Sequence, residues 1–267
     1  MQKKKWQNCL MKTKRKNKTN NKNWLENFLR LIFPPDIKCI FCGKDINHFY
    51  ERPFCDSCGK TLSFNVGNRC RICDEPIENE ALVCDNCQKR KHYFKHAYCP
   101  FVYVDKVRQN LLSYKSDNRR YLALGYALLI VKYIGEDIKN FDLITYVPMT
   151  KTREKERSFN QSKLLAEEIS KLTDLPVVES LKKNFDTKAQ KELNYNERLK
   201  NIQNIFSVIN KKEIKDKNIL LVDDIITTCA TVNACAKELS KYANSISACA
   251  VARNKLHKKP KINKGYI

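Results

Sequence analysis

The spacing of hydrophobic residues changes along the chain and divides it into regions. From residue 98 to residue 253, short apolar runs alternate with longer segments whose apolar residues recur every three or four positions. The first pattern predicts buried strands and the second predicts helices. Strands are predicted at 99–104, 141–148, 218–222 and 245–252, and helices at 119–134, 160–172 and 231–243. This alternation predicts an α/β domain with a parallel sheet, helices on both faces and a core of its own.

The residues outside this domain follow other patterns. Residues 1–23 are polar and basic without periodicity, and we expect them to form a disordered tail. Residues 24–36 place apolar side chains at helical spacing ahead of two prolines, which predicts a short amphipathic helix. That helix can pack on the protein or make a peripheral contact with a membrane surface. Residues 37–97 are rich in cysteine, and residues 254–267 form a basic C-terminal tail.

The cysteine-rich region contains four C-x-x-C pairs between residues 39 and 87. Two residues between cysteines let both thiolates face one metal ion, and two such turns complete the four-sulfur shell that zinc prefers. The spacing favours two sequential zinc ribbons with structural Zn²⁺ ions, although a cross-braced pairing also fits it. An iron–sulfur cluster or a set of unligated buried cysteines would also produce such pairs. The eight predicted ligands are Cys39, Cys42, Cys55, Cys58, Cys70, Cys73, Cys84 and Cys87.

The net charge and the cysteine content indicate which binding partners and which cell compartment to expect for this protein. The 267-residue chain carries 51 lysines and arginines against 29 acidic residues, a net charge of +22. This excess favours nucleic acid, nucleotides or anionic lipid as partners, although a lysine-rich proteome would produce it too. No secretory signal follows the first basic cluster and no apolar run is long enough to span a bilayer, so we expect a cytoplasmic protein. In that reducing compartment, the 13 cysteines should bind metal or be buried.

The strand predicted at 218–222 ends in two aspartates and a run of small hydroxylated residues, "ILLVDDIITTCAT" at 219–231. Ligands of parallel sheets bind beyond the carboxyl ends of the strands. There Asp223 and Asp224 can accept hydrogen bonds from ribose hydroxyls, and the following turn can hold a phosphate at a helix N-terminus. A structural helix cap would explain the threonines but not both aspartates. An ATPase is excluded, because the chain has no matching G-x-x-x-x-G-K-[ST] loop.

This segment resembles the phosphoribosyl pyrophosphate (PRPP) signature of type I phosphoribosyltransferases. Other segments are similar to the ComF family of late competence proteins, which joins a zinc ribbon to a phosphoribosyltransferase-like domain. "LIFPP" resembles the start of that family, and "RSFNQ" at 157–161 resembles its R-G-F-N-Q segment. A later pattern of the family is matched by Thr187, Gln190, Leu193, Arg198, Asn201 and Phe206. The resemblance covers roughly residues 24–253.

The resemblance also implies which residues form the site. The candidates for PRPP binding are Asp223, Asp224, Thr227, Thr228, Cys229, Ala230 and Thr231. The candidates for the pyrophosphate loop are Pro148, Met149, Thr150, Lys151 and Arg153. The candidates for substrate contact are Arg157, Asn160, Gln161, Gln190 and Arg198. Mg²⁺ is expected to bind together with PRPP.

Three functions agree with these features. The first is transfer of a phosphoribosyl group from PRPP to an acceptor that no motif identifies. The second is handling of incoming single-stranded DNA or its nucleotides in natural transformation. The third is a non-catalytic zinc-ribbon adaptor that binds proteins of the competence machinery.

Three residues depart from the patterns that they resemble: Ser158 and Cys229 stand where glycine is usual, and Phe185 stands where many relatives have a basic residue. If position 229 requires a positive φ angle, cysteine there is strained by about 1–2 kcal/mol. We then expect Cys229→Gly to bind PRPP as well as the wild type does, or up to about tenfold more tightly.

Overall fold

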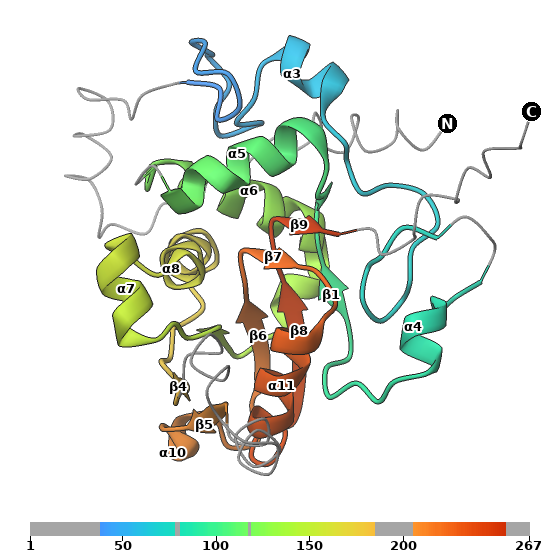
Figure 1. Cartoon of the computed structure of the whole chain (residues 1–267), viewed down its shortest axis with the longest axis vertical. Helices are drawn as coiled ribbons and strands as arrows, with labels where there is room; N and C mark the ends of the chain where they lie inside the picture. Colours follow the sequence, from blue (N-terminus) through green and yellow to red (C-terminus); the bar gives the residue numbers. More distant parts are fainter. Residues whose placement is uncertain (1–37, 78–80, 117–118, 185–204, 255–267) are drawn as a thin grey trace, which may run out of the picture.

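The fold is built around a parallel sheet whose strands lie between residues 97 and 249 (Figure 1). The computed structural model describes residues 38–77, 81–116, 119–184 and 205–254. Its main sheet has the order β1 (Ala97–Tyr98), β8 (Ser245–Cys249), β6 (Asn218–Val222) and β3 (Leu143–Tyr146). All neighbouring strands in this sheet are parallel, which confirms the predicted α/β class.

Bends change two of the predicted strands. β2 (Phe101–Val102) lies inside the strand predicted at 99–104, whereas β1 precedes that range, and Pro100 between them has no N–H to donate to a ladder. The last gives β8 and then β9 (Ala252–Arg253). Beyond the bend, β2, β9 and β7 (Ile225–Ile226) form a second parallel sheet, toward which the arrowheads of β6 and β8 point in Figure 1.

Helices cover both faces of the main sheet, as predicted. On one face α6 (Leu122–Ile134) and α8 (Gln161–Thr173) pack together, and on the other lies α11 (Ala230–Leu239). The side chains of β6 are apolar on both faces of the sheet: Leu220 and Val222 lie in one hydrophobic cluster, and Ile219 and Leu221 lie in the other. A helix layer on each face is therefore needed to bury them. Within the described ranges, no helix has the length and apolarity required to cross a membrane. The amphipathic segment 24–36 lies outside those ranges.

Several short elements were not predicted from the sequence. A helix, α5 (Asp105–Ser116), precedes α6, and α7 (Lys151–Arg157) precedes α8. The others are α3 (Asp56–Thr61), α4 (Asp85–Gln88), a 3-10 helix η1 (Gly135–Asn140), α10 (Lys211–Ile214), and the antiparallel pair β4 (Leu181–Lys183) and β5 (Phe206–Val208). In α5 the buried residues Val107, Leu111 and Tyr114 follow helical spacing, so its signal was present in the sequence.

The cysteine-rich region shares its core with the α/β domain, so the expectation of a separate core for residues 98–253 is wrong. Ile40 and Phe54 belong to the same hydrophobic cluster as α6 and α8. Cys70 to Cys87 belong to the cluster that contains α11 and the opposite face of the sheet. Contact with the first ribbon is close, since a Cβ atom on Gly125 of α6 would lie 2.6 Å from the Ile40 Cγ2 atom. The first ribbon therefore packs with α6 and α8, whereas the second packs with α11 and hydrogen-bonds to the edge strand β1 through the Ala97 N–H and the Ile72 carbonyl.

Candidate functional site

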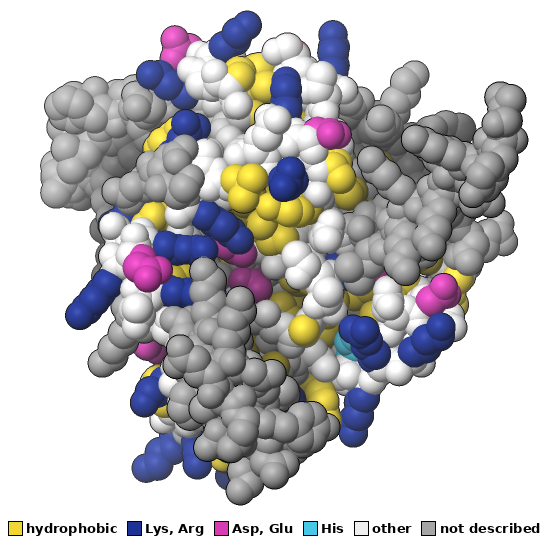
Figure 2. All heavy atoms as spheres, viewed as in Figure 1, with side chains coloured by type: hydrophobic (Ala, Val, Ile, Leu, Met, Phe, Trp, Pro, Cys, Tyr) yellow, Lys and Arg dark blue, Asp and Glu magenta, His cyan; other side chains and the backbone are white. Residues whose placement is uncertain are grey.

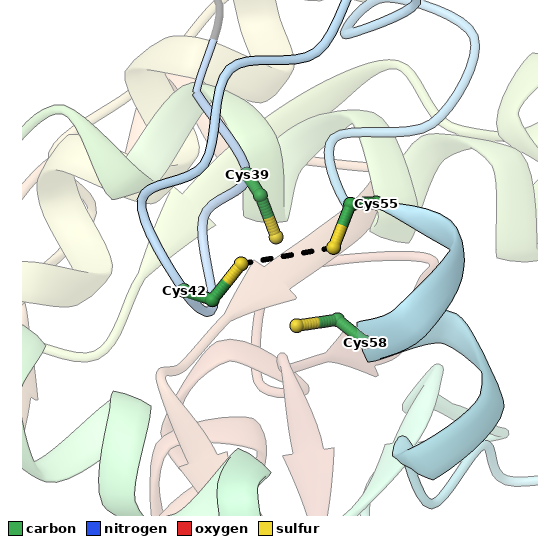
Figure 3. A group of neighbouring side chains, drawn as sticks. All are labelled: Cys39, Cys42, Cys55 and Cys58. Carbon is green, nitrogen blue, oxygen red and sulfur yellow. Dashed lines mark hydrogen bonds between the residues drawn. The ribbon is translucent and has the colours of Figure 1, made fainter.

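The eight paired cysteines form two groups of four. The first group is Cys39, Cys42, Cys55 and Cys58, the second is Cys70, Cys73, Cys84 and Cys87, and the ligand atoms of each group lie within 4.8 Å of one another. Figure 3 shows the sulfur atoms of the first group pointing toward a common centre. Sγ atoms 3.6 Å apart, as in Cys42–Cys55 and Cys73–Cys84, suit Zn–S bonds of about 2.3 Å in a tetrahedron. The side chains thus fit two zinc ions, and the pairing is sequential, not cross-braced.

The two groups differ in their exposure. All four cysteines of the second group are buried, whereas Cys42 is exposed and Cys55 is half-buried. The hydroxyl of Ser57, 3.1 Å from the Cys55 sulfur, lowers the pKa of Cys55 to about 6. Reagents in solution reach an exposed cysteine more readily than a buried one, and Cys42 is exposed. The first group is therefore the more accessible to chelators and oxidants.

Asp223 and Asp224 follow β6 directly, at the carboxyl ends of the strands, as predicted. Backbone hydrogen bonds hold both residues: the Asp223 N–H donates to the Cys249 carbonyl over 2.9 Å, and the Val251 N–H donates to the Asp224 carbonyl over 3.1 Å. The Asp224 N–H also donates to Asp223 Oδ1 over 2.8 Å. Burial, followed by the charge of Asp224, raises the pKa of Asp223 to about 7. The two carboxyl groups form a fixed acidic pair.

Two residues that the sequence did not identify contact this acidic pair. Lys115, near the end of α5, places its Nζ atom 2.9 Å from Asp224 Oδ2. Ser162, in the first turn of α8, donates a hydrogen bond from Oγ to Asp223 Oδ1 over 3.1 Å. Both contacts oppose the effect of burial and lower the pKa of Asp223. The helical spacing of α5 is the signal that could have placed Lys115 at the site.

The residues after β7 form the predicted turn into a helix, and we refer to them as the 227–231 loop. Its exposed members are Thr227, Thr228, Ala230 and Thr231. Cys229 precedes α11 with φ 63° and ψ 1°, the left-handed conformation that favours glycine. This residue is 4% exposed, and the neighbouring side chain of Cys73 in the second zinc group is the main cause of the raised pKa of its thiol. The sulfur therefore faces the ribbon, while the threonines face solvent.

The loop after β3 lies at the same end of the sheet as the acidic pair. The Val147 N–H donates to the carbonyl of Val222, the last residue of β6, over 2.9 Å. Pro148 and Met149 are half-buried. Thr150 is buried and caps α7, where its Oγ1 accepts a hydrogen bond from the Arg153 N–H over 3.4 Å. The side chain of Lys151 lies outside the described part, so its contact with pyrophosphate stays a prediction.

The "RSFNQ" segment connects α7 to α8. Ser158 has φ 65°, which explains the glycine at this position of the pattern it resembles. Asn160 is buried, caps α8 and donates from Nδ2 to the Val147 carbonyl over 3.2 Å, so it joins α8 to the loop after β3. Gln161 is fully buried and Arg157 is half-buried. Contact of these residues with substrate stays a prediction.

One face of the molecule is rich in basic side chains. Figure 2 shows many Lys and Arg side chains and few acidic ones on the viewed face. The nine basic residues of the first 22 positions lie outside the described ranges, as do the substrate candidates Gln190 and Arg198.

Comparisons with known proteins agree with this organisation. Residues 28–88 match the double zinc ribbon domain family, and residues 160–267 match the phosphoribosyl transferase domain family. Competence protein F of Haemophilus influenzae is 27% identical over 214 residues, which span 77% of this chain and 92% of that protein. Competence protein ComFC of Bacillus subtilis is 26% identical over 220 residues, which span 76% of this chain and 85% of that protein. The ribbon match favours zinc over an iron–sulfur cluster.

The fold was also matched to a crystal structure of a hypothetical protein from Neisseria gonorrhoeae with bound ppGpp, and the match covers 55% of this chain and 74% of the chain of that protein. Its sequence identity is 14% and its TM-score is 0.31, so it carries no argument about this chain.

Proposed function

We propose that this chain, a member of the ComF family that joins a double zinc ribbon to a phosphoribosyltransferase domain, binds PRPP together with Mg²⁺. The observation that carries the proposal is the juxtaposition of an acidic pair with an exposed threonine loop at the start of α11. Asp223 and Asp224 supply acceptors for vicinal ribose hydroxyls. The 227–231 loop supplies backbone N–H groups and hydroxyls for the 5′-phosphate at a helix N-terminus.

The rest of the site suits the remaining parts of PRPP. Lys151 and Arg153 are the candidates for pyrophosphate, in the loop that Asn160 joins to α8. Mg²⁺ prefers oxygen ligands and would be held mainly by the ligand's own phosphate and ribose oxygens beside the acidic pair. Lys115 neutralises Asp224 in the free protein, so a ribose hydroxyl must share or displace its ammonium group. A transfer reaction here would depend on positioning and on charge stabilisation at the departing pyrophosphate.

Calorimetry tests this proposal. The wild type should bind PRPP in the presence of Mg²⁺, and Asp224→Asn, which keeps the shape of the side chain but removes its charge, should bind it much more weakly. Wild-type protein that shows no heat of binding with PRPP and Mg²⁺ would contradict the proposal. Release of pyrophosphate on addition of candidate acceptors then separates transfer from binding alone.

A second function, handling of single-stranded DNA or its nucleotides in natural transformation, is favoured by the net charge of +22 and by the competence names of the two relatives. Deleting residues 1–22 removes nine cations, so the salt dependence of single-stranded DNA binding should become shallower. An unchanged slope would show that this tail makes no contact with DNA. Binding of neither PRPP nor DNA would leave a zinc-ribbon adaptor for competence proteins as the function. We place this activity in the cytoplasm, whose reducing conditions suit eight thiolate ligands.

A further inference from the structure

Arg253, the last residue of β9, connects the second zinc group to the 227–231 loop. Its side chain is 1% exposed. On one side, Nε donates to the Cys73 carbonyl over 2.8 Å, while Nη2 lies 3.5 Å from Cys73 Sγ and 3.3 Å from the Glu75 carboxylate. On the other side, Nη1 donates to the carbonyls of Ile226, over 3.2 Å, and of Thr227. One buried guanidinium group thus joins a zinc ligand to the start of the loop.

The chemistry of arginine suits this connection. The guanidinium group is planar, remains charged and presents five N–H donors in a rigid fork. Its donors are directed at backbone carbonyls on both sides, and Glu75, which is fully buried, balances its charge. A displacement of the ribbon at Cys73 would therefore be transmitted to the loop, because the fork cannot stretch.

Independent contacts attach the far side of the loop to the same ribbon. Cys229, which is 4% exposed, belongs to the same hydrophobic cluster as Cys73. In α11, the Asn233 side chain accepts a hydrogen bond from the Tyr93 N–H over 2.8 Å and donates to the Lys91 carbonyl over 3.1 Å. The second ribbon therefore holds the loop at its beginning, at its left-handed residue and in the first turn of the helix that follows.

We propose that Arg253 is a positioning residue that couples the second zinc site to the 227–231 loop, so that PRPP and the second zinc ion each strengthen the binding of the other. This inference rests on the proposed PRPP site. Coupling between two sites is reciprocal, so it can be measured from either one. The first zinc group belongs to the other hydrophobic cluster, with α6 and α8, so the coupling belongs to the second group.

The experiment begins with wild-type protein that carries both zinc ions and binds PRPP by calorimetry. PRPP with Mg²⁺ should slow the transfer of the slowly released, buried zinc ion to a chelator by at least about fivefold, the lower end of typical coupling between sites. Arg253→Met should weaken PRPP binding at least about fivefold. It should also weaken zinc binding at the second site about 10- to 100-fold, as is usual when a group that holds a metal ligand is removed.

A matched control exists in the same ribbon. Arg69 pairs with Asp74 over 3.3 Å and lies over the Tyr133 ring, so Arg69→Met removes another arginine–carboxylate pair from the ribbon. It should leave PRPP affinity unchanged. Arg253→Lys keeps the charge but not the fork, and should lose the effect of PRPP on zinc release while the protein stays folded.

Two results would overturn the coupling. One is wild-type protein that binds PRPP but releases its second zinc ion at an unchanged rate, a measurement that needs no variant to fold. The other is folded, zinc-loaded Arg253→Met that binds PRPP as tightly as the wild type does. Wild-type protein that does not bind PRPP at all refutes the proposed function, and the coupling with it, at the first step of the experiment.

Discussion

Substitutions at Cys229 test whether the backbone strain at this residue affects the free energy of unfolding or the free energy of PRPP binding. Its φ of 63° places a residue with a β-carbon in the left-handed region, which is strained by about 1–2 kcal/mol. Cys229 is 4% exposed and packs in the same cluster as the second ribbon, so we expect it to keep this conformation in the free and the bound protein, and the strain then cancels in the free energy of binding. From the sequence we expect Cys229→Gly to bind PRPP equally well or up to about tenfold more tightly, and the structure narrows this expectation to no significant change.

The strain should appear in the free energy of unfolding instead. Cys229→Ala keeps the β-carbon but removes a buried sulfur in contact with Cys73, a loss of about 1 kcal/mol by analogy with one buried methylene. Cys229→Gly loses the same sulfur but relieves the strain, and part of this gain is offset by the flexibility of unfolded glycine. We expect the glycine variant to be more stable than the alanine variant by about 1 kcal/mol.

Urea unfolding of zinc-loaded protein measures this difference, provided that the two variants share one dependence on urea concentration. Cys235, a fully buried cysteine inside α11, is the matched control. There the order should reverse, with alanine more stable than glycine by about 1 kcal/mol, because glycine is a poor helix former. An alanine variant at 229 as stable as the glycine variant would refute the strain argument. A glycine variant that binds PRPP tenfold more tightly would show that the loop changes conformation on binding.

Further predictions concern zinc, folding and pH. Elemental analysis should find two zinc ions per chain, and a chelator should remove the ion of the first group first, because Cys42 is exposed. Cys55→Ser should lower the melting temperature of the ribbons and the α/β domain together, because the first ribbon shares its core with α6. A variant whose α/β domain melts at the wild-type temperature would contradict this. PRPP affinity should rise about tenfold from pH 6 to pH 8, because below a pKa of about 7 the ligand must displace a proton from Asp223. Asp223→Asn should lose this dependence beyond the titration of PRPP itself, and Lys115→Met should move its midpoint to higher pH, because the Lys115 charge lowers the pKa of Asp223.

The features predicted correctly from the sequence are those encoded by local spacing. Period-two and apolar runs located the parallel strands, helical spacing located α6, α8 and α11, and the C-x-x-C pairs located both metal groups. The two aspartates were placed at the end of β6 because their position depends only on where one strand stops. Ser158 and Cys229 stand where the resembled patterns have glycine, and both have a positive φ, Ser158 at the end of α7 and Cys229 at the start of α11.

The features that were missed depend on contacts between distant segments. Gly125 and Ile40 are far apart in the sequence but pack closely in the fold. No local sequence pattern shows that a zinc ribbon will pack against a glycine in a helix. Lys115 and Arg253 are two among 51 basic residues, and their roles follow from the tertiary positions of Asp224 and Cys73. Charged side chains acquire such roles through burial and partners, which spacing along one chain does not contain.

The central claim is that the acidic pair after β6 binds PRPP, and the double substitution Asp223→Ala with Asp224→Ala tests it most directly. The variant should keep both zinc ions, because the eight ligands lie in the ribbons, and its circular dichroism should match that of the wild type. Calorimetry with PRPP and Mg²⁺ should then show binding to the wild type and none to the folded variant. A folded double variant that binds PRPP as tightly as the wild type would contradict the account.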